Sequence, residues 1–159
     1  MQTLKKTLVR VLTAGAILSV TACSGMRPDT LGLHEGKLSP CPSKPNCVSS
    51  YSADEIHQIT PYRYPVGNQS NAALIEQLKE ALGSIPRTEV ITATDTYLHA
   101  EATSFLMRYV DDIEFLVDGD AGLVHVRSAS RIGYSDFGVN RERVEAIRKY
   151  LLEKQQISP

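Results

Sequence analysis

The chain has 159 residues, of which 42% are hydrophobic and 22% are charged. This length and composition are typical of one globular domain and exclude a disordered chain. The formal net charge of the whole chain is -1. Residues 1–22 contain three basic residues and no acid, so the remainder, with 14 basic and 18 acidic residues, has a net charge of -4. A general nucleic-acid binder needs a basic face, so we expect no nucleic-acid partner.

The first 25 residues, MQTLKKTLVRVLTAGAILSVTACSG, have the pattern of an export signal. A positive region ending at Arg10 precedes an uncharged stretch, residues 11–20, which is shorter than the about 20 apolar residues that span a bilayer. Residues 20–23, Val-Thr-Ala-Cys, resemble the bacterial lipobox. An uncleaved buried helix with an incidental cysteine would not explain this order, so we predict that residues 1–22 are a lipoprotein signal peptide.

Cys23 is the predicted lipidation site, where acyl chains such as palmitate would anchor the protein in a membrane of the cell envelope, facing the periplasm. Ser24 favours the outer membrane, because Asp at this position favours inner-membrane retention. Residues 23–39 contain three glycines and little periodicity, so we predict a flexible tether that reaches roughly 20–25 Å. Residues 40–153 then form a single globular domain, and residues 154–159 form a polar tail.

A loop with two prolines, residues 41–50, opens the domain. Cys41 and Cys47 lie six residues apart, and in an oxidising periplasm this spacing predicts a small-loop disulfide. A metal site would need further ligands, for example His57, His99 or His125, and the spacing matches no zinc motif, so we predict no metal and no cofactor.

The next predicted elements are a short strand within residues 59–66 and a helix over residues 71–82. Prolines interrupt the strand, whereas the helix has its apolar residues on one face, Ser70 or Asn71 to cap it and Gly83 to end it.

Four strands are predicted over residues 88–94, 97–104, 113–117 and 123–130, followed by a helix over residues 141–152. The short connections favour antiparallel pairing. We therefore predict the α+β class, with a two-layer, four-stranded antiparallel sheet and two helices in the order α-β-β-β-β-α.

Alternation within the strands separates a polar face from an apolar one. His99 and Glu101 share one face of the second strand, and His125 and Arg127 share one face of the fourth. An enzyme of the hydrolase or transferase type could use these four side chains. A nucleophile such as Ser128 or Ser130 with Asp136 as an orienting group is a further combination, but no nucleophile-elbow motif accompanies it.

The stretch RSASRIGYSDFGVNRER, residues 127–143, connects the last strand to the last helix. Gly133 and Gly138 suit positive backbone φ angles in a tight loop, Asn140 is placed to cap the helix, and Asp136 could pair with Arg131 or Arg141. These loop residues have a structural interpretation that needs no ligand.

The arginines leave two interpretations open. Arg127, Arg131, Asn140 and Arg141 could bind an anion, because arginine forks and free amides at the start of a helix both favour negative charge. The alternative is a scaffold of salt bridges to acids, namely Asp111, Asp112, Glu142 and Glu145.

Residues 45–50 (PNCVSS), the pair Asp111-Asp112 and residues 127–141 resemble domain-of-unknown-function family 1499, over residues 41–152. The resemblance implies no particular reaction. The leading hypothesis is a lipid-anchored envelope protein that binds an envelope protein or a small anionic ligand and catalyses nothing; the alternative is the periplasmic enzyme described above.

Overall fold

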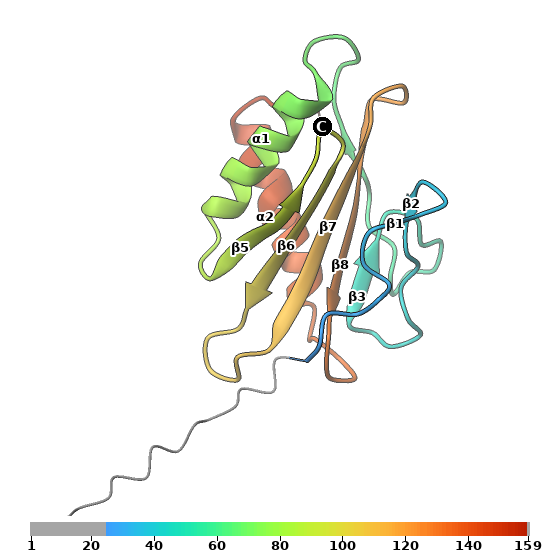
Figure 1. Cartoon of the computed structure of the whole chain (residues 1–159), viewed down its shortest axis with the longest axis vertical. Coiled ribbons are helices and arrows are strands. Elements are labelled where there is room, and N and C mark those ends of the chain that lie inside the picture. Colours follow the sequence, from blue (N-terminus) through green and yellow to red (C-terminus); the bar gives the residue numbers. More distant parts are fainter. Residues whose placement is uncertain (1–24, 159) are drawn as a thin grey trace, which may run out of the picture.

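The computed structural model describes residues 25–158 (Figure 1). The predicted signal peptide, Cys23 and Ser24 lie outside these described residues. The described elements are, in chain order, β1 (Leu33–His34), β2 (Lys37–Leu38), β3 (Cys47–Ser49), β4 (Tyr62–Arg63), α1 (Asn71–Gly83), β5 (Thr88–Ala93), β6 (Tyr97–Thr103), β7 (Val110–Asp118), β8 (Leu123–Ser130) and α2 (Val139–Glu153). Among them, neither helix has the length and apolar character needed to cross a membrane.

The strands β5 to β8 form an antiparallel meander, which confirms the predicted α+β class and strand pairing. The predicted count of four strands is wrong, because β3 and β4 both pair with the outer edge of β8 and make the sheet six-stranded. The predicted order is also incomplete, since β4 lies within the short strand predicted over residues 59–66 but β1, β2 and β3 were not predicted. Strands of two or three residues beside prolines are too short to produce an alternating pattern.

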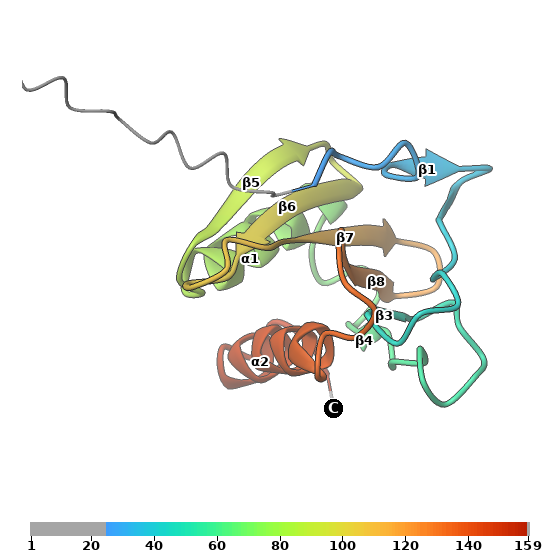
Figure 2. The same cartoon turned by 90° about the horizontal axis from the view of Figure 1, so that it is seen from below.

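Both helices cover one face of the sheet, and the main apolar core lies between these two layers (Figure 2). Ser70 caps α1, because its Oγ accepts a hydrogen bond from the Ala73 N–H at 3.2 Å. The fully buried side chains of this core include Tyr62, Leu74, Leu78, Leu98, Ile113, Phe115, Val126 and Ile147.

The opposite face of the sheet is covered by residues 25–46, so the described part of the predicted tether, residues 25–39, packs on the domain. Leu38 is buried with Tyr97 and Leu116 in a second, smaller apolar cluster. The Gly32 N–H donates a hydrogen bond to the Glu114 side chain. These contacts join residues about 60 to 80 positions apart, which explains why no local pattern indicated them.

The predicted polar tail also packs on the domain. Ile157 is buried, and the Ser158 N–H donates to the Arg63 carbonyl oxygen at 2.7 Å. The C-terminal segment therefore extends the edge that β4 forms.

Candidate functional site

The polar face of the sheet carries two rows of side chains beneath the N-terminal segment. The strand register aligns His99, Glu114 and Arg127 in one row. It aligns Glu101 with Asp112 in the next. Glu114 and Arg127 carry opposite charges on neighbouring strands, which stabilises their pairing, whereas Glu101 and Asp112 carry like charges that repel unless a cation lies between them.

Glu114 is 0% exposed, yet its carboxylate has three partners. Oε1 accepts hydrogen bonds from the Tyr97 hydroxyl and the Gly32 N–H, both at 2.8 Å, and Oε2 accepts one from Arg127 Nη1 at 3.0 Å. Burial and the neighbouring Glu114 charge raise the pKa of Tyr97 above its ordinary value, so this hydroxyl stays a donor. The sequence interpretation missed Glu114, although Glu114 is the single acid within the otherwise apolar strand predicted over residues 113–117.

Arg131 closes the second row. Its side chain is 6% exposed and donates to Asp112 through Nε at 2.8 Å and Nη2 at 2.7 Å, and Nη2 also donates to Glu101. Asp112 is also bonded to His99 Nε2 at 2.8 Å. Burial alone would raise the pKa of Asp112, but the hydrogen bonds from Arg131 and His99 outweigh it and hold this pKa below its ordinary value.

Three potential metal ligands, His99, Glu101 and Asp112, have ligand atoms within 4.8 Å of one another. The guanidinium of Arg131 bonds both carboxylates and already supplies the positive charge that a cation would bring. Binding a metal there would leave a buried arginine without its partners, so we assign no metal to this cluster.

A cavity of about 430 Å³ lies between the N-terminal segment, the disulfide loop and the polar face of β8. We call it the arginine pocket. Its walls are largely apolar, and its polar groups come from the sheet and the loop. The apolar walls come from Met26, Pro28, Pro40, Pro42 and Ala129, and the polar groups from Lys44, Asn46, Asp112, Arg127, Ser130 and Arg131, among others.

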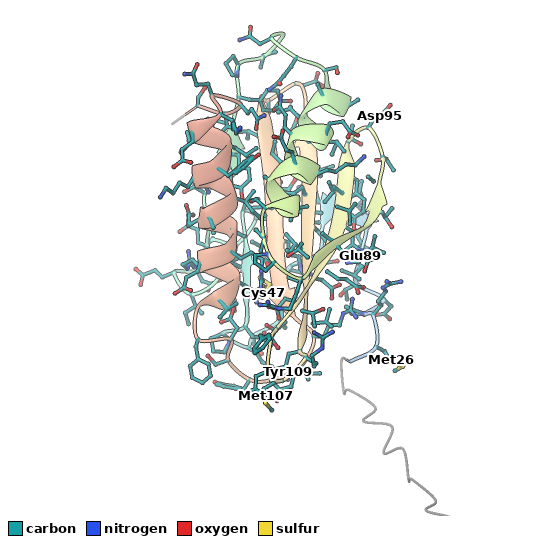
Figure 3. All side chains as sticks on the ribbon, turned by 90° about the vertical axis from the view of Figure 1, so that its left-hand side faces the viewer. Met26, Cys47, Glu89, Asp95, Met107 and Tyr109 are labelled. Atoms are coloured by element: carbon teal, nitrogen blue, oxygen red, sulfur yellow. A yellow bond between two sulfur atoms is a disulfide. The ribbon has the colours of Figure 1, made fainter. Side chains whose placement is uncertain are left out.

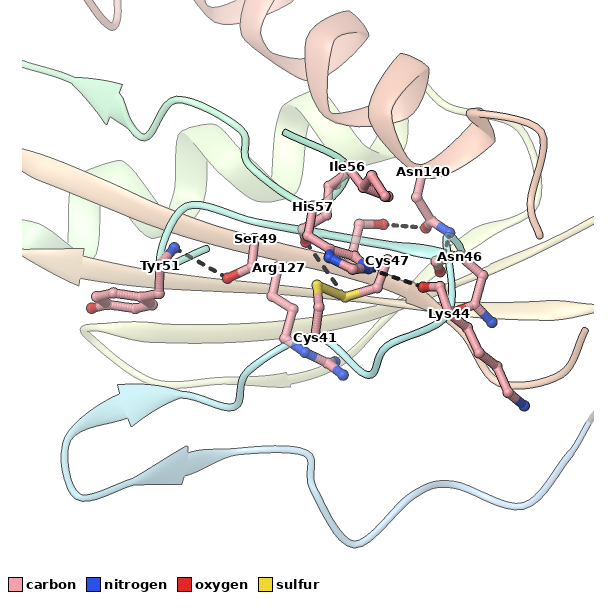
Figure 4. The surroundings of a disulfide bond; sticks show 12 residues. Cys41, Lys44, Asn46, Cys47, Ser49, Tyr51, Ile56, His57, Arg127 and Asn140 are labelled. Carbon is pink, nitrogen blue, oxygen red and sulfur yellow. Dashed lines mark hydrogen bonds between the residues drawn. A yellow bond between two sulfur atoms is a disulfide. The ribbon is translucent and has the colours of Figure 1, made fainter. Parts of the chain in front are cut away.

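Two buried polar atoms of the pocket-lining residues have no hydrogen-bond partner among the described residues: Arg127 Nε and Asn46 Oδ1. The Arg127 side chain is 5% exposed and extends from β8 toward Cys41 (Figure 4). A buried polar group without a partner costs about 1–3 kcal/mol, and native proteins contain few of them. Two residues of the pocket wall therefore carry hydrogen-bonding groups that no described residue uses.

The loop closed by the disulfide, residues 41–47, forms a wall of the arginine pocket and is fixed to the rest of the domain. Cys41 and Cys47 form a disulfide, and Cys47 pairs with Ala129 of β8. Asn46 Nδ2 donates to the Gly133 carbonyl oxygen at 3.0 Å. A covalent bond and a β-pairing thus hold the loop beside Arg127.

Asn140 does not line the arginine pocket, and the prediction that it caps α2 is wrong. Gly138 is the N-cap, and Asp136 satisfies the first turn by accepting from the N–H groups of Gly138 and Asn140, both at 3.0 Å. The predicted pairing of Asp136 with Arg131 or Arg141 is therefore also wrong. Gly133 and Gly138 have φ angles of 96° and 87°, as the loop interpretation requires.

The buried Asn140 side chain instead joins α2 to the sheet. Its Nδ2 donates to Ser130 Oγ at 3.0 Å, and its Oδ1 accepts from Ser128 Oγ and Arg143 Nη1. Arg143 in turn pairs with Asp111 at 2.7 Å. These groups therefore act as a scaffold in this structure.

Arg141 is likewise separate from the arginine pocket. Its guanidinium donates to the carbonyl oxygens of Gln58 and Ile56 at 2.7 and 2.9 Å, which ties the start of α2 to the loop before β4. Of the four residues in the anion-binding hypothesis, only Arg127 and Arg131 line the cavity.

The residues of the enzymatic hypothesis do not all converge, because His99 and Glu101 lie close together but His125 lies apart from them. His99 and His125 lie on strands separated by β7 and in different rows, about 12 Å apart at standard sheet spacing. His125 stacks on Tyr51 at 4.2 Å, and Ser130 Oγ contacts the Asn140 amide rather than an imidazole.

Together these features define an α+β domain with a buried arginine–carboxylate network beside a small, largely apolar pocket. A model of a family described as "Protein of unknown function (DUF1499)" matches residues 37–151, and the chain belongs to this family. A search among curated proteins found no match.

Proposed function

We propose that the protein is a lipid-anchored cell-envelope protein whose domain binds, without catalysing a reaction, a small acid with an apolar body. The single observation that carries this proposal is Arg127, whose buried Nε has no partner among residues 25–158 and which lines a cavity of about 430 Å³. This volume falls within the range of small-molecule sites.

The unused donor capacity of Arg127 favours a carboxylate. Nη1 is occupied by Glu114, which leaves Nε available. Arginine forks bind carboxylates through paired, charge-assisted hydrogen bonds. The exposed Lys44 adds a positive charge at the rim, and the proline and methionine side chains offer the ligand body an apolar surface.

The anchor is supported by the order of the positive region, the uncharged stretch and the lipobox-like residues before Cys23. Protein expressed with labelled palmitate should carry the label and fractionate with membranes. The Cys23→Ala variant should lose both properties. Tight, detergent-requiring membrane association of the Cys23→Ala protein would refute the anchor.

The pocket is tested with the full chain, purified in a non-ionic detergent. Titration calorimetry should detect binding of hexanoate or benzoate but not of the matching amides, because only a carboxylate offers Arg127 two charged acceptor oxygens. Lys44→Gln should weaken binding without lowering the melting temperature, since this side chain is exposed.

A cavity-filling variant provides the matched comparison. Ala129→Leu places a larger side chain on the pocket wall and should abolish binding, whereas Ala93→Leu, on the exposed side of β5, should not. Equal binding of acids and amides, or full binding by Ala129→Leu, would refute the arginine pocket as the site.

A further inference from the structure

One end of the domain exposes an unusual set of apolar side chains. Among residues 25–158, five large hydrophobic residues are at least 72% exposed, and all five belong to three segments: the start of the described chain, the β6–β7 loop and the β8–α2 loop. These five are Met26 (92%), Phe105 (76%), Leu106 (81%), Tyr134 (72%) and Phe137 (93%).

The three segments lie at the same end of the molecule (Figure 1), and we call this set of side chains the apolar end. Figure 3 shows Met26, Met107 and Tyr109 together at this end, where the described chain begins. Met107 and Tyr109, both in the β6–β7 loop, are exposed as well. Exposed apolar groups gathered in this way mark an interaction surface.

The predicted lipidation site is close to the same end. A Cβ atom at Gly25 would lie only 3.1 Å from Arg131 Cβ and 3.2 Å from Ile132 Cγ2, so Gly25 packs closely at the start of the β8–α2 loop. Cys23 precedes Gly25 by two residues, and two residues span at most about 7 Å. Acyl chains on Cys23 would therefore enter the bilayer beside the apolar end.

Two arginines, Arg87 and Arg108, lie near the apolar side chains. Arg87 lies over the Phe105 ring at 5.4 Å, and Arg108 follows Met107 in the β6–β7 loop. The nearby acid Asp136 is engaged with the backbone of α2. Apolar groups flanked by arginines are the pattern of surfaces that insert among anionic lipid headgroups.

We infer that the apolar end rests on the bilayer into which the acyl chains of Cys23 insert, with Leu106 and Phe137 entering the headgroup region. The inference rests on the proposed acylation. It gives the domain a defined orientation and places the arginine pocket, which Met26 and Arg131 line, next to the membrane surface.

The chain contains no tryptophan, so the tryptophan fluorescence of a variant comes only from the position where one tryptophan is introduced. Leu106→Trp, Phe137→Trp and the control Val66→Trp are reconstituted as acylated full chains in vesicles of phosphatidylethanolamine and phosphatidylglycerol. Val66 is also exposed but belongs to the β4–α1 loop, at the opposite end (Figure 1). Tryptophan at positions 106 and 137 should show blue-shifted emission and at least twofold quenching by brominated lipids, and position 66 should show neither.

Three results would overturn the inference, and they are distinguishable. Mass spectrometry that finds Cys23 unacylated removes both the anchor and this orientation. Acylated protein whose positions 106 and 137 are quenched no more than position 66 refutes the membrane contact alone. Protection of these tryptophans from aqueous acrylamide only after addition of envelope protein, without lipid quenching, assigns the apolar end to a protein partner instead.

Discussion

Arg131→Ala should be strongly destabilising, because it removes the cation between two carboxylates on the covered face of the sheet. Arg131 and Asp112 have side chains that are 6% and 2% exposed. Breaking a buried pair from one side costs about 3–5 kcal/mol, since the remaining charge stays buried without its partner. For a domain of this size, a loss of 1 kcal/mol in unfolding free energy lowers the midpoint of thermal unfolding by about 3–5 °C, so this midpoint should fall by roughly 10–20 °C.

The assay is thermal and urea unfolding of the variant beside Lys79→Ala. Lys79 pairs with Glu76 on the exposed surface of α1, with side chains that are 33% and 70% exposed. Its loss should cost less than about 1 kcal/mol. Adding Asp112→Asn to Arg131→Ala should restore part of the lost stability, because the uncompensated charge is removed. A cost below about 1 kcal/mol for Arg131→Ala would refute the buried network.

Two further predictions concern acid and reduction. The pKa values of Asp112 and Glu101 lie below their ordinary values, because their hydrogen bonds to positive groups outweigh burial, so the unfolded chain binds more protons in the window between the folded and unfolded pKa values. The stability from these pairs is present above about pH 5 and should be lost as the pH falls through the folded pKa values. In a plot of unfolding free energy against pH, Asp112→Asn should reduce this loss at low pH, and the exposed control Asp95→Asn should not. Serine at both Cys41 and Cys47 should lower the free energy of unfolding by about 2 kcal/mol in urea titrations, as expected for a small closed loop, and an unchanged midpoint would contradict the stabilising role.

The sequence alone determined the elements whose pattern is local. The apolar stripe and caps predicted α1 to within one residue, and β8 was predicted with its observed bounds. Alternation also placed His99, Glu101 and Arg127 on polar strand faces, because successive side chains of a strand point to opposite sides. Family membership likewise followed from motifs that are contiguous in the chain.

Only the tertiary structure decided which of these residues form a site. The pairing of Arg127 with Glu114, and of Arg131 with Asp112, depends on strand register and on loop geometry. The N-terminal segment covers the polar face through contacts with residues about 80 positions away, and nothing in its own composition encodes them. The periodicity of apolar residues indicates which side of a helix or strand is buried, whereas long-range packing determines which residues that side contacts.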